Sequence, residues 1–334
     1  MRNILFIFLS CLALGFIEKT TPAELNYQSN TYSCLYHRNQ GRLDGQYNSY
    51  YRNGRKRAEG YFDNNQRTGK WSVWDSTGIL LVQRIYTDPY NYKQLVPKVP
   101  NNKLVGLLNV PMHKAGYNQN GYINYFDMQY GMAENVIYLY KWLAPEQNPL
   151  IFDHGILFKT LCESVRNKSL SAYPTPYDPG ILQEPLLSFD NDSIRLIGYK
   201  LRHEWIFDNV RLVSEFRPLE FCPVVVRDSG QDTIDLFWIR YWDCRKIFAG
   251  ITLSDSCCEG KINTMDDLFF YHYFHGSIYM ERGYKNIKGS LEDDINVIPV
   301  NERDKKTEQE EINLIEHEHD LWVTFTGGKS YWEP

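Results

Sequence analysis

The feature that most constrains the fold of this chain is an internal repeat of 24 residues between positions 41 and 90. Residues 45–50 align with residues 69–74, and Asn53-Gly54 aligns with Thr77-Gly78. Periodicity of this length is typical of stacked units that cannot bury their apolar faces singly. An Asn-Gly pair between aromatic runs is a hairpin signal, because both turn residues tolerate positive φ. The repeat therefore predicts a small antiparallel β-meander, which needs support from the rest of the chain because two units alone are marginal.

Glycines and aromatic residues occupy fixed places in each unit of the repeat. The pattern Gly-x-Tyr-x-x-Tyr-Tyr-x-Asn-Gly returns as Gly-x-Trp-x-x-Trp-Asp-x-x-Gly one period later. The positions that carry it are Gly45, Tyr47, Tyr50, Gly54, Gly69, Trp71, Trp74 and Gly78. This pattern resembles MORN-type repeats, which commonly serve as interaction or spacer surfaces. Packing of aromatic rings between hairpins explains the same residues structurally. We predict a MORN-like module over residues 24–90.

The first 23 residues have the features of a secretory signal peptide. Arg2 gives a short basic start, and residues 4–17 form an apolar stretch of 14 residues. That stretch is shorter than the roughly 18 residues that a membrane-spanning helix needs. A lipid anchor on Cys11 and a buried N-terminal helix are the alternatives, and the sequence does not define the cleavage site. We therefore expect an exported chain whose cysteines can oxidise, with a connectivity that their irregular spacing does not specify.

Charge and composition exclude several classes of function. Lys and Arg total 36 against 41 Asp and Glu, so the chain has no basic excess for binding the phosphate backbone of nucleic acid. Aromatic residues make up 15% of the chain, which is typical of a packed core and excludes disorder for most of it. Glycine-rich phosphate loops and serine nucleophile elbows are absent from the sequence. We expect no nucleic-acid partner, no membrane span and no cofactor.

Pro, Asn and Gly concentrate between residues 88 and 130, and we predict a linker over residues 91–130. Beyond it, apolar residues recur at helical spacing in four places. The first predicted helix contains Ala133, Ile137, Tyr140 and Leu143 and ends at Pro145, and the second follows an Asp153 cap and buries Leu157, Leu161 and Val165. The third runs from Thr264 through His272, His275 and Tyr279. The fourth begins with a capping box at Thr307 and continues through Phe325. The predicted strands are residues 194–201, 204–207, 211–217, 221–226 and 236–242. Strands and helices without regular βαβ alternation predict an α+β domain over residues 131–334.

Few residues in this domain are arranged for chemistry. His317 and His319 are the best metal candidates, but positions i and i+2 of a helix point about 200° apart, which favours a solvated acidic helix face. His272 and His275 share an apolar environment and are predicted to pack. The charge-dense residues 281–311 are predicted to be mostly a loop. No cysteine comes with a histidine and carboxylate that the sequence places together.

Charged residues also alternate with aromatic ones inside the predicted strands. Glu204, Asp208, Arg211 and Arg217 show this pattern. It indicates buried or interfacial ion pairs that fix strand register, with ordinary surface pairs as an equal alternative.

Several short motifs follow one another in a consistent order between residues 131 and 323. They are Glu204-Trp205-Ile206-Phe207-Asp208 with Arg211, Phe216-Arg217-Pro218-Leu219, Leu236-Phe237-Trp238-Ile239 with Cys244-Arg245, and the segment from Glu316 to Trp322. In this order they resemble the GldN/PorN family of type IX secretion and gliding motility. The residues that carry the resemblance, and that we take as interface candidates, are Trp205, Phe207, Asp208, Arg211, Arg217, Trp238, Arg245, Asp320 and Trp322.

The resemblance implies a non-enzymatic structural subunit of the periplasmic ring of that machinery. It implies peripheral association with the outer membrane through a GldK/PorK-like lipoprotein, contacts with neighbouring ring subunits, and inner-membrane motor-complex proteins as further partners. A ring requires two different complementary patches on each subunit, and Trp and Tyr are enriched in such patches. The alternatives are a MORN-type module that captures peptide or cell-wall ligands on a supporting C-terminal domain, and a metal-dependent hydrolase.

Overall fold

The structure is a computed structural model. It describes residues 23–87, 91–97, 116–125, 133–176, 194–209, 211–227, 233–257, 260, 262–283 and 295–326. Apart from its last residue, the predicted signal peptide lies outside this part of the chain, as does Cys11.

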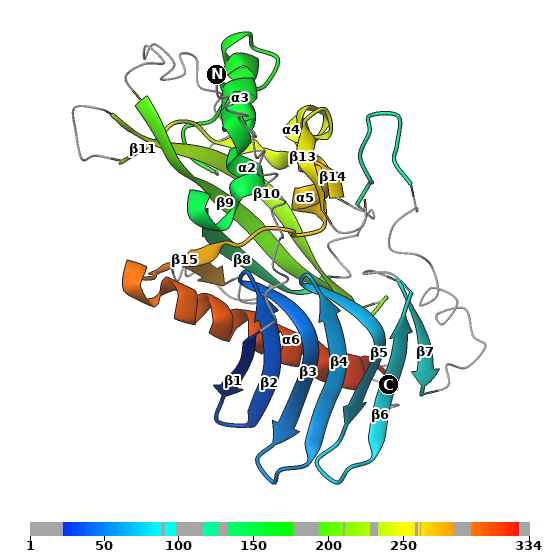
Figure 1. Cartoon of the computed structure of the whole chain (residues 1–334). Helices are drawn as coiled ribbons and strands as arrows, with labels where there is room; N and C mark the ends of the chain where they lie inside the picture. The colour runs from blue at the N-terminus through cyan, green and yellow to red at the C-terminus, as the bar shows by residue number, and fades with distance from the viewer. Residues whose placement is uncertain are drawn as a thin grey trace, which may run out of the picture.

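The N-terminal half is a seven-stranded antiparallel sheet whose strands follow sequence order (Figure 1). The strands are β1 (Ala23–Gln28), β2 (Tyr32–Asn39), β3 (Arg42–Tyr51), β4 (Lys56–Asp63), β5 (Gln66–Trp74), β6 (Leu80–Tyr86) and β7 (Tyr92–Val96). Gly54 and Gly78 close equivalent hairpin turns, with φ of 79° and 94°. The predicted meander is confirmed, and β7 continues it into the segment predicted as a linker.

Alternation along the strands gives this sheet two different faces. Tyr47 and Trp71, which are equivalent in the repeat, are fully buried on one face with ring centroids 5.8 Å apart. Tyr50 and Trp74 point to the other face and are half-buried. Gly60 lies against the Trp71 ring, where an added Cβ would come within 2.1 Å of a ring carbon. The aromatic packing of the repeat therefore requires glycine at this position.

The C-terminal half combines a mixed set of helices with a second antiparallel sheet, which confirms the α+β class. The main path of this sheet runs β11-β10-β9-β8-β15-β16, with β12 also pairing with β10. Its strands are β8 (Ala133–Leu143), β9 (Ile194–Asp208), β10 (Val213–Arg227), β11 (Thr233–Asp235), β12 (Ile239–Arg240), β15 (Ser277–Gly283) and β16 (Ile295–Val297), beside a small hairpin of β13 (Thr252–Cys257) and β14 (Ile262–Thr264).

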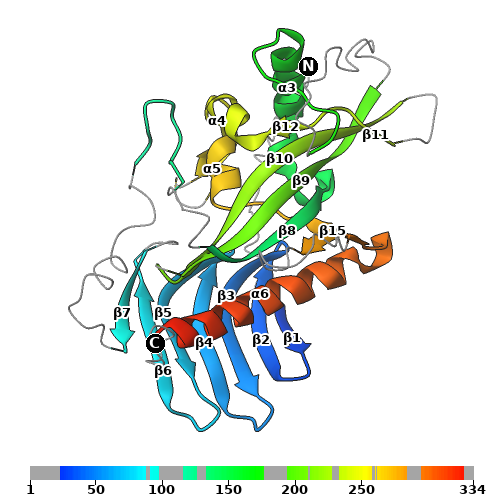
Figure 2. The same ribbon diagram turned by 180° about the vertical axis from the view of Figure 1, so that it is seen from behind.

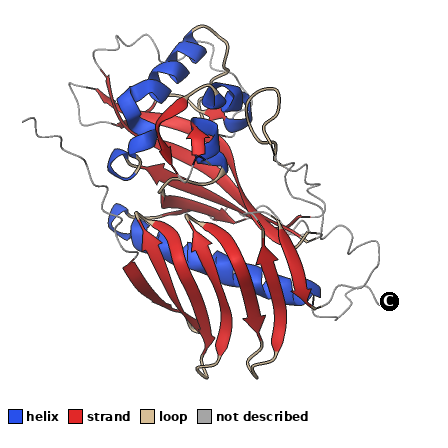
Figure 3. Cartoon of the chain, turned by 45° about the vertical axis from the view of Figure 1, so that its right-hand side comes forward, coloured by secondary structure: helices blue, strands red, loops and turns tan. Residues whose placement is uncertain are grey.

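The helices fall into two groups (Figure 3). The short ones gather at the end of the second sheet that is remote from the meander: η2 (Pro145–Gln147), α2 (Pro149–Phe152), η3 (Asp153–Gly155), α3 (Ile156–Arg166), α4 (Tyr241–Ala249) and α5 (Met265–Phe270). The chain then passes through η6 (Val300–Glu302) into the long helix α6 (Arg303–Thr326). No helix in the described part of the chain is long and apolar enough to cross a membrane.

The helix predicted over residues 133–143 is wrong, because these residues form strand β8. Ala133, Ile137, Tyr140 and Leu143 do recur at helical spacing, but the segment between them is rich in β-branched and aromatic residues. It pairs with β9 on one side and β15 on the other. β-Branched and aromatic side chains pack well against neighbouring strands, and here this packing outweighs the helical periodicity.

Other boundaries also differ from prediction. The strand predicted over residues 236–242 is reduced to β12, because α4 begins at Tyr241. The helix opened by Thr264 has the predicted capping box but ends at Phe270, and Tyr279 lies in β15.

The last helix begins earlier than predicted. Thr307 lies inside α6, where its hydroxyl donates to the Arg303 carbonyl and accepts from the Ile278 amide. Residues 303–311 are therefore helical and not part of a loop. Helix α3 has the predicted buried face but follows Gly155, not Asp153, as its N-cap.

Helix α6 lies across the inner face of the meander and faces β9 and β10 on its other side (Figures 1 and 2). One hydrophobic core is shared by all three, and its largest members are Trp71, Trp205 and Trp322. A second core lies between the second sheet and helices α2 to α5. Two repeat units were predicted to be marginal alone, and in the structure helix α6 covers the apolar face of the meander.

Candidate functional site

The contact between α6 and the meander is built on ion pairs. Strands β2, β4 and β5 each send one arginine from the inner face of the sheet to one glutamate of the helix. The pairs are Arg38–Glu311 at 2.8 Å, Arg57–Glu316 at 2.5 Å and Arg67–Glu318 at 2.8 Å. We call these three pairs the arginine cradle. Their side chains are at most 19% exposed, so the pairs are shielded from the solvent that weakens surface salt bridges.

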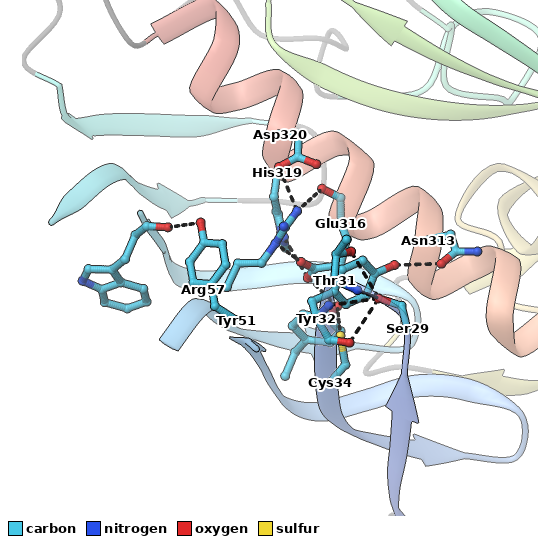
Figure 4. Close-up of polar contacts among 12 residues, drawn as sticks. Ser29, Thr31, Tyr32, Cys34, Tyr51, Arg57, Asn313, Glu316, His319 and Asp320 are labelled. Atoms are coloured by element: carbon cyan, nitrogen blue, oxygen red, sulfur yellow. Dashed lines mark hydrogen bonds and ion pairs between the residues drawn. The ribbon is translucent and has the colours of Figure 1, made fainter. Parts of the chain in front are cut away.

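Glu316 is the most enclosed member of the cradle, with 1% of its side chain exposed. It lies beside Arg57 and His319 (Figure 4). Its carboxylate accepts from the Tyr47 hydroxyl at 2.7 Å and lies 3.2 Å from Nδ1 of His319. Arg57 also reaches Asp320, at 2.8 Å. Burial alone would raise the pKa of Glu316, but His319 and Arg57 outweigh it and hold the pKa at about 2. The carboxylate is therefore ionised at neutral pH, although it is buried.

The other two glutamates tie α6 to the second sheet as well. Glu311 also pairs with Lys141 of β8 at 2.9 Å, and Glu318 accepts from the Ser214 hydroxyl of β10 at 2.5 Å. Burial raises the pKa of Glu311, yet Lys141 and Arg38 lower it further, to about 2. Each of these carboxylates therefore bridges the two halves of the molecule.

A cavity of about 120 Å³ lies where the meander, α6 and the second sheet meet. Its polar lining includes Arg67, Lys141, His203, His272, Glu311 and Glu318. His203 is 1% exposed, and neither of its ring nitrogens has a hydrogen-bond partner among the described residues. Burial lowers the pKa of His203 well below its usual value and that of His272 to about 4. Both rings are therefore neutral at pH 7, so they do not repel the nearby positive charge of Lys141.

The ion pairs of the cradle hold the meander, helix α6 and the second sheet together, and the other groups that could carry out chemistry are not arranged for it. No group of three or more His, Cys, Asp or Glu side chains in the described part of the chain is placed to hold a metal ion. The thiols of Cys34, Cys162, Cys222 and Cys244 are unpaired and buried, and burial raises the pKa of each. A buried thiol with a raised pKa is a poor nucleophile.

Comparison with protein families gives one match, to the gliding motility associated protein GldN, over residues 127–323. This covers more than half of the chain and almost the same residues as the predicted resemblance. The chain belongs to the GldN family. A search of curated proteins found no match. Family membership makes the chain a component of the gliding-motility and type IX secretion machinery. Members of the GldN family are structural components, and the family is not a known enzyme family.

The GldN region begins just before β8 and ends near the C-terminus of α6. The meander lies outside it, so the MORN-like resemblance rests on the repeat and on the compatible strand arrangement. Within the repeat, Gly45, Gly54, Gly69 and Gly78 all adopt positive φ, between 61° and 118°. These glycines therefore occupy backbone positions that other residues rarely adopt.

Seven of the nine predicted GldN signature residues lie in the protein interior, each at most 5% exposed. They are Trp205, Phe207, Asp208, Arg217, Trp238, Arg245 and Trp322. Trp205 and Phe207 face α6, where Trp205 packs on His317 and Phe207 on Phe325. These residues stabilise the fold of the GldN region itself, and a role as contacts for a partner would require an exposure that the fold does not provide.

The charged signature residues form internal pairs. Asp208 and Arg211 close the β9–β10 hairpin at 2.6 Å, and Arg217 pairs with Glu215 at 2.8 Å. Their burial agrees with the prediction of ion pairs that fix strand register. Of the nine candidates, Asp320 alone is largely exposed, with 64% of its side chain accessible.

Arg245 is held in an aromatic cage. It makes two hydrogen bonds to Asp266, at 2.9 and 2.6 Å, while Tyr122, Tyr125 and Tyr241 surround its guanidinium. Tyr122 and Tyr125 come from the segment predicted as a linker, so this cage anchors that segment to the GldN region.

The solvated acidic helix face predicted at 317–320 is wrong for Glu318 and His319, whereas Asp320 is exposed. Glu316, Glu318 and His319 are at most 2% exposed, because the meander covers one side of α6 and β9–β10 cover the other. Sequence reasoning also missed Arg57 and Arg67. For Arg67 a signal was available, because strand alternation places it on the same face as the buried Trp71. For Arg57 simple alternation gives the wrong face, that of the exposed Tyr61, because the β3–β4 pairing shifts its register at this residue.

Proposed function

We propose that this GldN-family chain is a non-enzymatic structural subunit of a periplasmic ring, held at the outer membrane by a GldK/PorK-like lipoprotein. The family match over residues 127–323 carries the proposal. The arginine cradle supports the proposal, because its buried ion pairs connect the meander to the GldN region. Neighbouring ring subunits and inner-membrane motor-complex proteins are the further partners.

Contacts in such a ring need surface that the fold leaves exposed. Among the described residues of the GldN region, the most exposed large apolar side chains are Ile156, Trp242, Val297 and Val300, between 42% and 75%. Val297 and Val300 lie together at β16, the last strand of the second sheet, and at the turn that leads into α6. Exposed apolar residues beside a sheet edge are typical of protein contact sites.

Purification of the tagged chain from detergent-solubilised envelopes tests the proposal. We expect the lipoprotein to co-purify and ring-shaped particles to appear by electron microscopy. A monodisperse monomer without the lipoprotein would count against the proposal.

A pair of matched substitutions separates this function from ligand capture by the meander. Val300→Asp changes the GldN region at a residue that is 75% exposed, and Ile79→Asp changes a hairpin tip of the meander at 63% exposure. We expect Val300→Asp to reduce the yield of rings and Ile79→Asp to leave it unchanged. The reverse result would favour the meander as the binding module. Point substitutions suit this test better than a deletion of the meander, because deleting residues 24–90 would uncover the buried face of α6.

A further inference from the structure

The cavity of about 120 Å³ lies where three parts of the molecule meet. Helix α6 lines it with Glu311, Leu314, Ile315 and Glu318, which share one helix face because they are three or four residues apart. Strands of the meander and of the second sheet line the other sides. An engineered protein cavity of roughly 150 Å³ binds benzene, so the volume here suits a molecule no larger than a single six-membered ring.

Much of the cavity lining is apolar. The apolar members are Leu43, Phe62, Trp205, Phe216, Leu314 and Ile315. A buried water molecule needs about two to four polar partners, and the aliphatic side chains and ring faces in this set offer none. Water alone is therefore a poor occupant of the apolar part of the cavity.

The charged side chains of the lining are already paired within the protein. The pairs are Arg67–Glu318 at 2.8 Å, Lys141–Glu311 at 2.9 Å and Arg217–Glu215 at 2.8 Å. The Arg67 guanidinium also lies 5.1 Å from the ring centroids of Trp71 and Trp322, which are outside the lining. An ion of either sign would lose its hydration in this cavity without gaining a free counter-charge. The cavity therefore favours a neutral occupant.

His203 lines the cavity with both of its ring nitrogens unpaired. The residue is 1% exposed, and its ring stacks on Phe216 with centroids 5.5 Å apart. Because burial lowers the pKa of His203, the ring is neutral at pH 7 and has one donor and one acceptor. Buried polar groups without a partner are unfavourable, so His203 gains from an occupant that can form a hydrogen bond with it.

The cavity approaches solvent where the β4–β5 turn meets the residues that follow α5. Asn65 and Gln66 of the turn donate to the carbonyls of His272 and Tyr271, at 3.2 and 2.8 Å. All four residues line the cavity and are only partly buried. A small molecule would enter the cavity at this end.

We infer that the cavity binds a small neutral ring molecule that carries one hydroxyl group. The ring packs against Phe62, Trp205 and Phe216, and the hydroxyl group forms a hydrogen bond with His203. A hydroxyl group fits either tautomer of the histidine, because it both donates and accepts. Since the lining comes from the meander, α6 and the second sheet, the bound molecule stabilises their association. The inference does not depend on the proposed ring function, because the cavity lies within a single chain.

Calorimetric titration of the purified protein with phenol and with toluene tests the inference. Toluene has nearly the same size and lacks the hydroxyl group. We expect saturable binding of phenol to the wild type. In His203→Phe, which keeps a ring and removes both nitrogens, phenol should bind about tenfold more weakly while the binding of toluene does not weaken. The matched control His154→Phe changes a histidine whose side chain is 82% exposed, and it should bind both molecules like the wild type.

A third variant locates the site. Leu314→Phe adds volume at a side chain that lines the cavity, so it should abolish binding of both molecules. Thermal unfolding shows whether each variant is folded, and the His203→Phe comparison decides if Leu314→Phe is not. A wild type that binds no phenol holds water only, which would overturn the inference. Equal weakening of phenol and toluene in His203→Phe, or phenol binding that persists in a folded Leu314→Phe, would overturn it as well.

Discussion

Replacement of Glu316 by glutamine tests whether the arginine cradle holds the meander to the GldN region. The substitution keeps the shape of the side chain and removes its charge, so Arg57 loses the nearer of its two carboxylate partners, at 2.5 Å. Breaking one side of a buried ion pair costs about 3–5 kcal/mol. Asp320 still pairs with Arg57 at 2.8 Å, which places the expected loss at the lower end. We therefore expect the free energy of unfolding at pH 7 to fall by about 3 kcal/mol.

Urea unfolding followed by tryptophan fluorescence measures this loss, because the Trp71 ring lies 5.5 Å from the ring of His319 in the cradle. The matched control is Glu310→Gln on the same helix. Glu310 pairs with Lys306 one turn away at a quarter-exposed site, and such pairs contribute about 0.5 kcal/mol. If the two variants lose equal stability, the cradle does not hold the two layers together and the reasoning fails.

Three further predictions concern other parts of the fold. Gly60→Ala should lower the free energy of unfolding by about 1–3 kcal/mol, because the new Cβ overlaps the Trp71 ring; an unchanged thermal midpoint would show that the ring moves freely. Arg245→Lys should lower the midpoint in the same assay, because lysine cannot form the bidentate pair with Asp266, whereas the aromatic cage alone would tolerate either cation. The pKa of His272 is about 4 in the folded chain against about 6.5 unfolded, so the unfolded state binds the proton first and stability falls as pH drops from 6.5 to 4. His272→Asn should remove about 3 kcal/mol of that pH dependence, measured by urea unfolding between pH 4 and 7.5.

The parts of the fold that could be predicted are those that local sequence determines. The 24-residue repeat specifies the meander through turns at Gly54 and Gly78, which need positive φ whatever surrounds them. The capping box at Thr264 similarly depends on residues three positions apart. Both signals act within a few residues, so they survive in any tertiary context.

The parts that were missed depend on partners far away in the chain. Residues 133–143 fit a helical period, and only their neighbours β9 and β15 make them a strand. His319 was assigned to a solvated face because nothing nearby in the sequence indicates that the meander covers this turn of the helix, where Tyr47 contacts Glu316 from 269 residues earlier. The GldN resemblance located the right region, but it could not show that most of its aromatic signature is core.

The placement of α6 has a consequence for the order in which the protein can mature. The meander is synthesised well before helix α6, yet its inner face contacts that helix. Until residues near 320 arrive, three arginines and several aromatic rings on that face have no counterpart. Late contacts of this kind slow folding and leave early intermediates prone to association. A polypeptide truncated before residue 303 would thus keep an uncovered sheet face that carries these arginines and aromatic rings.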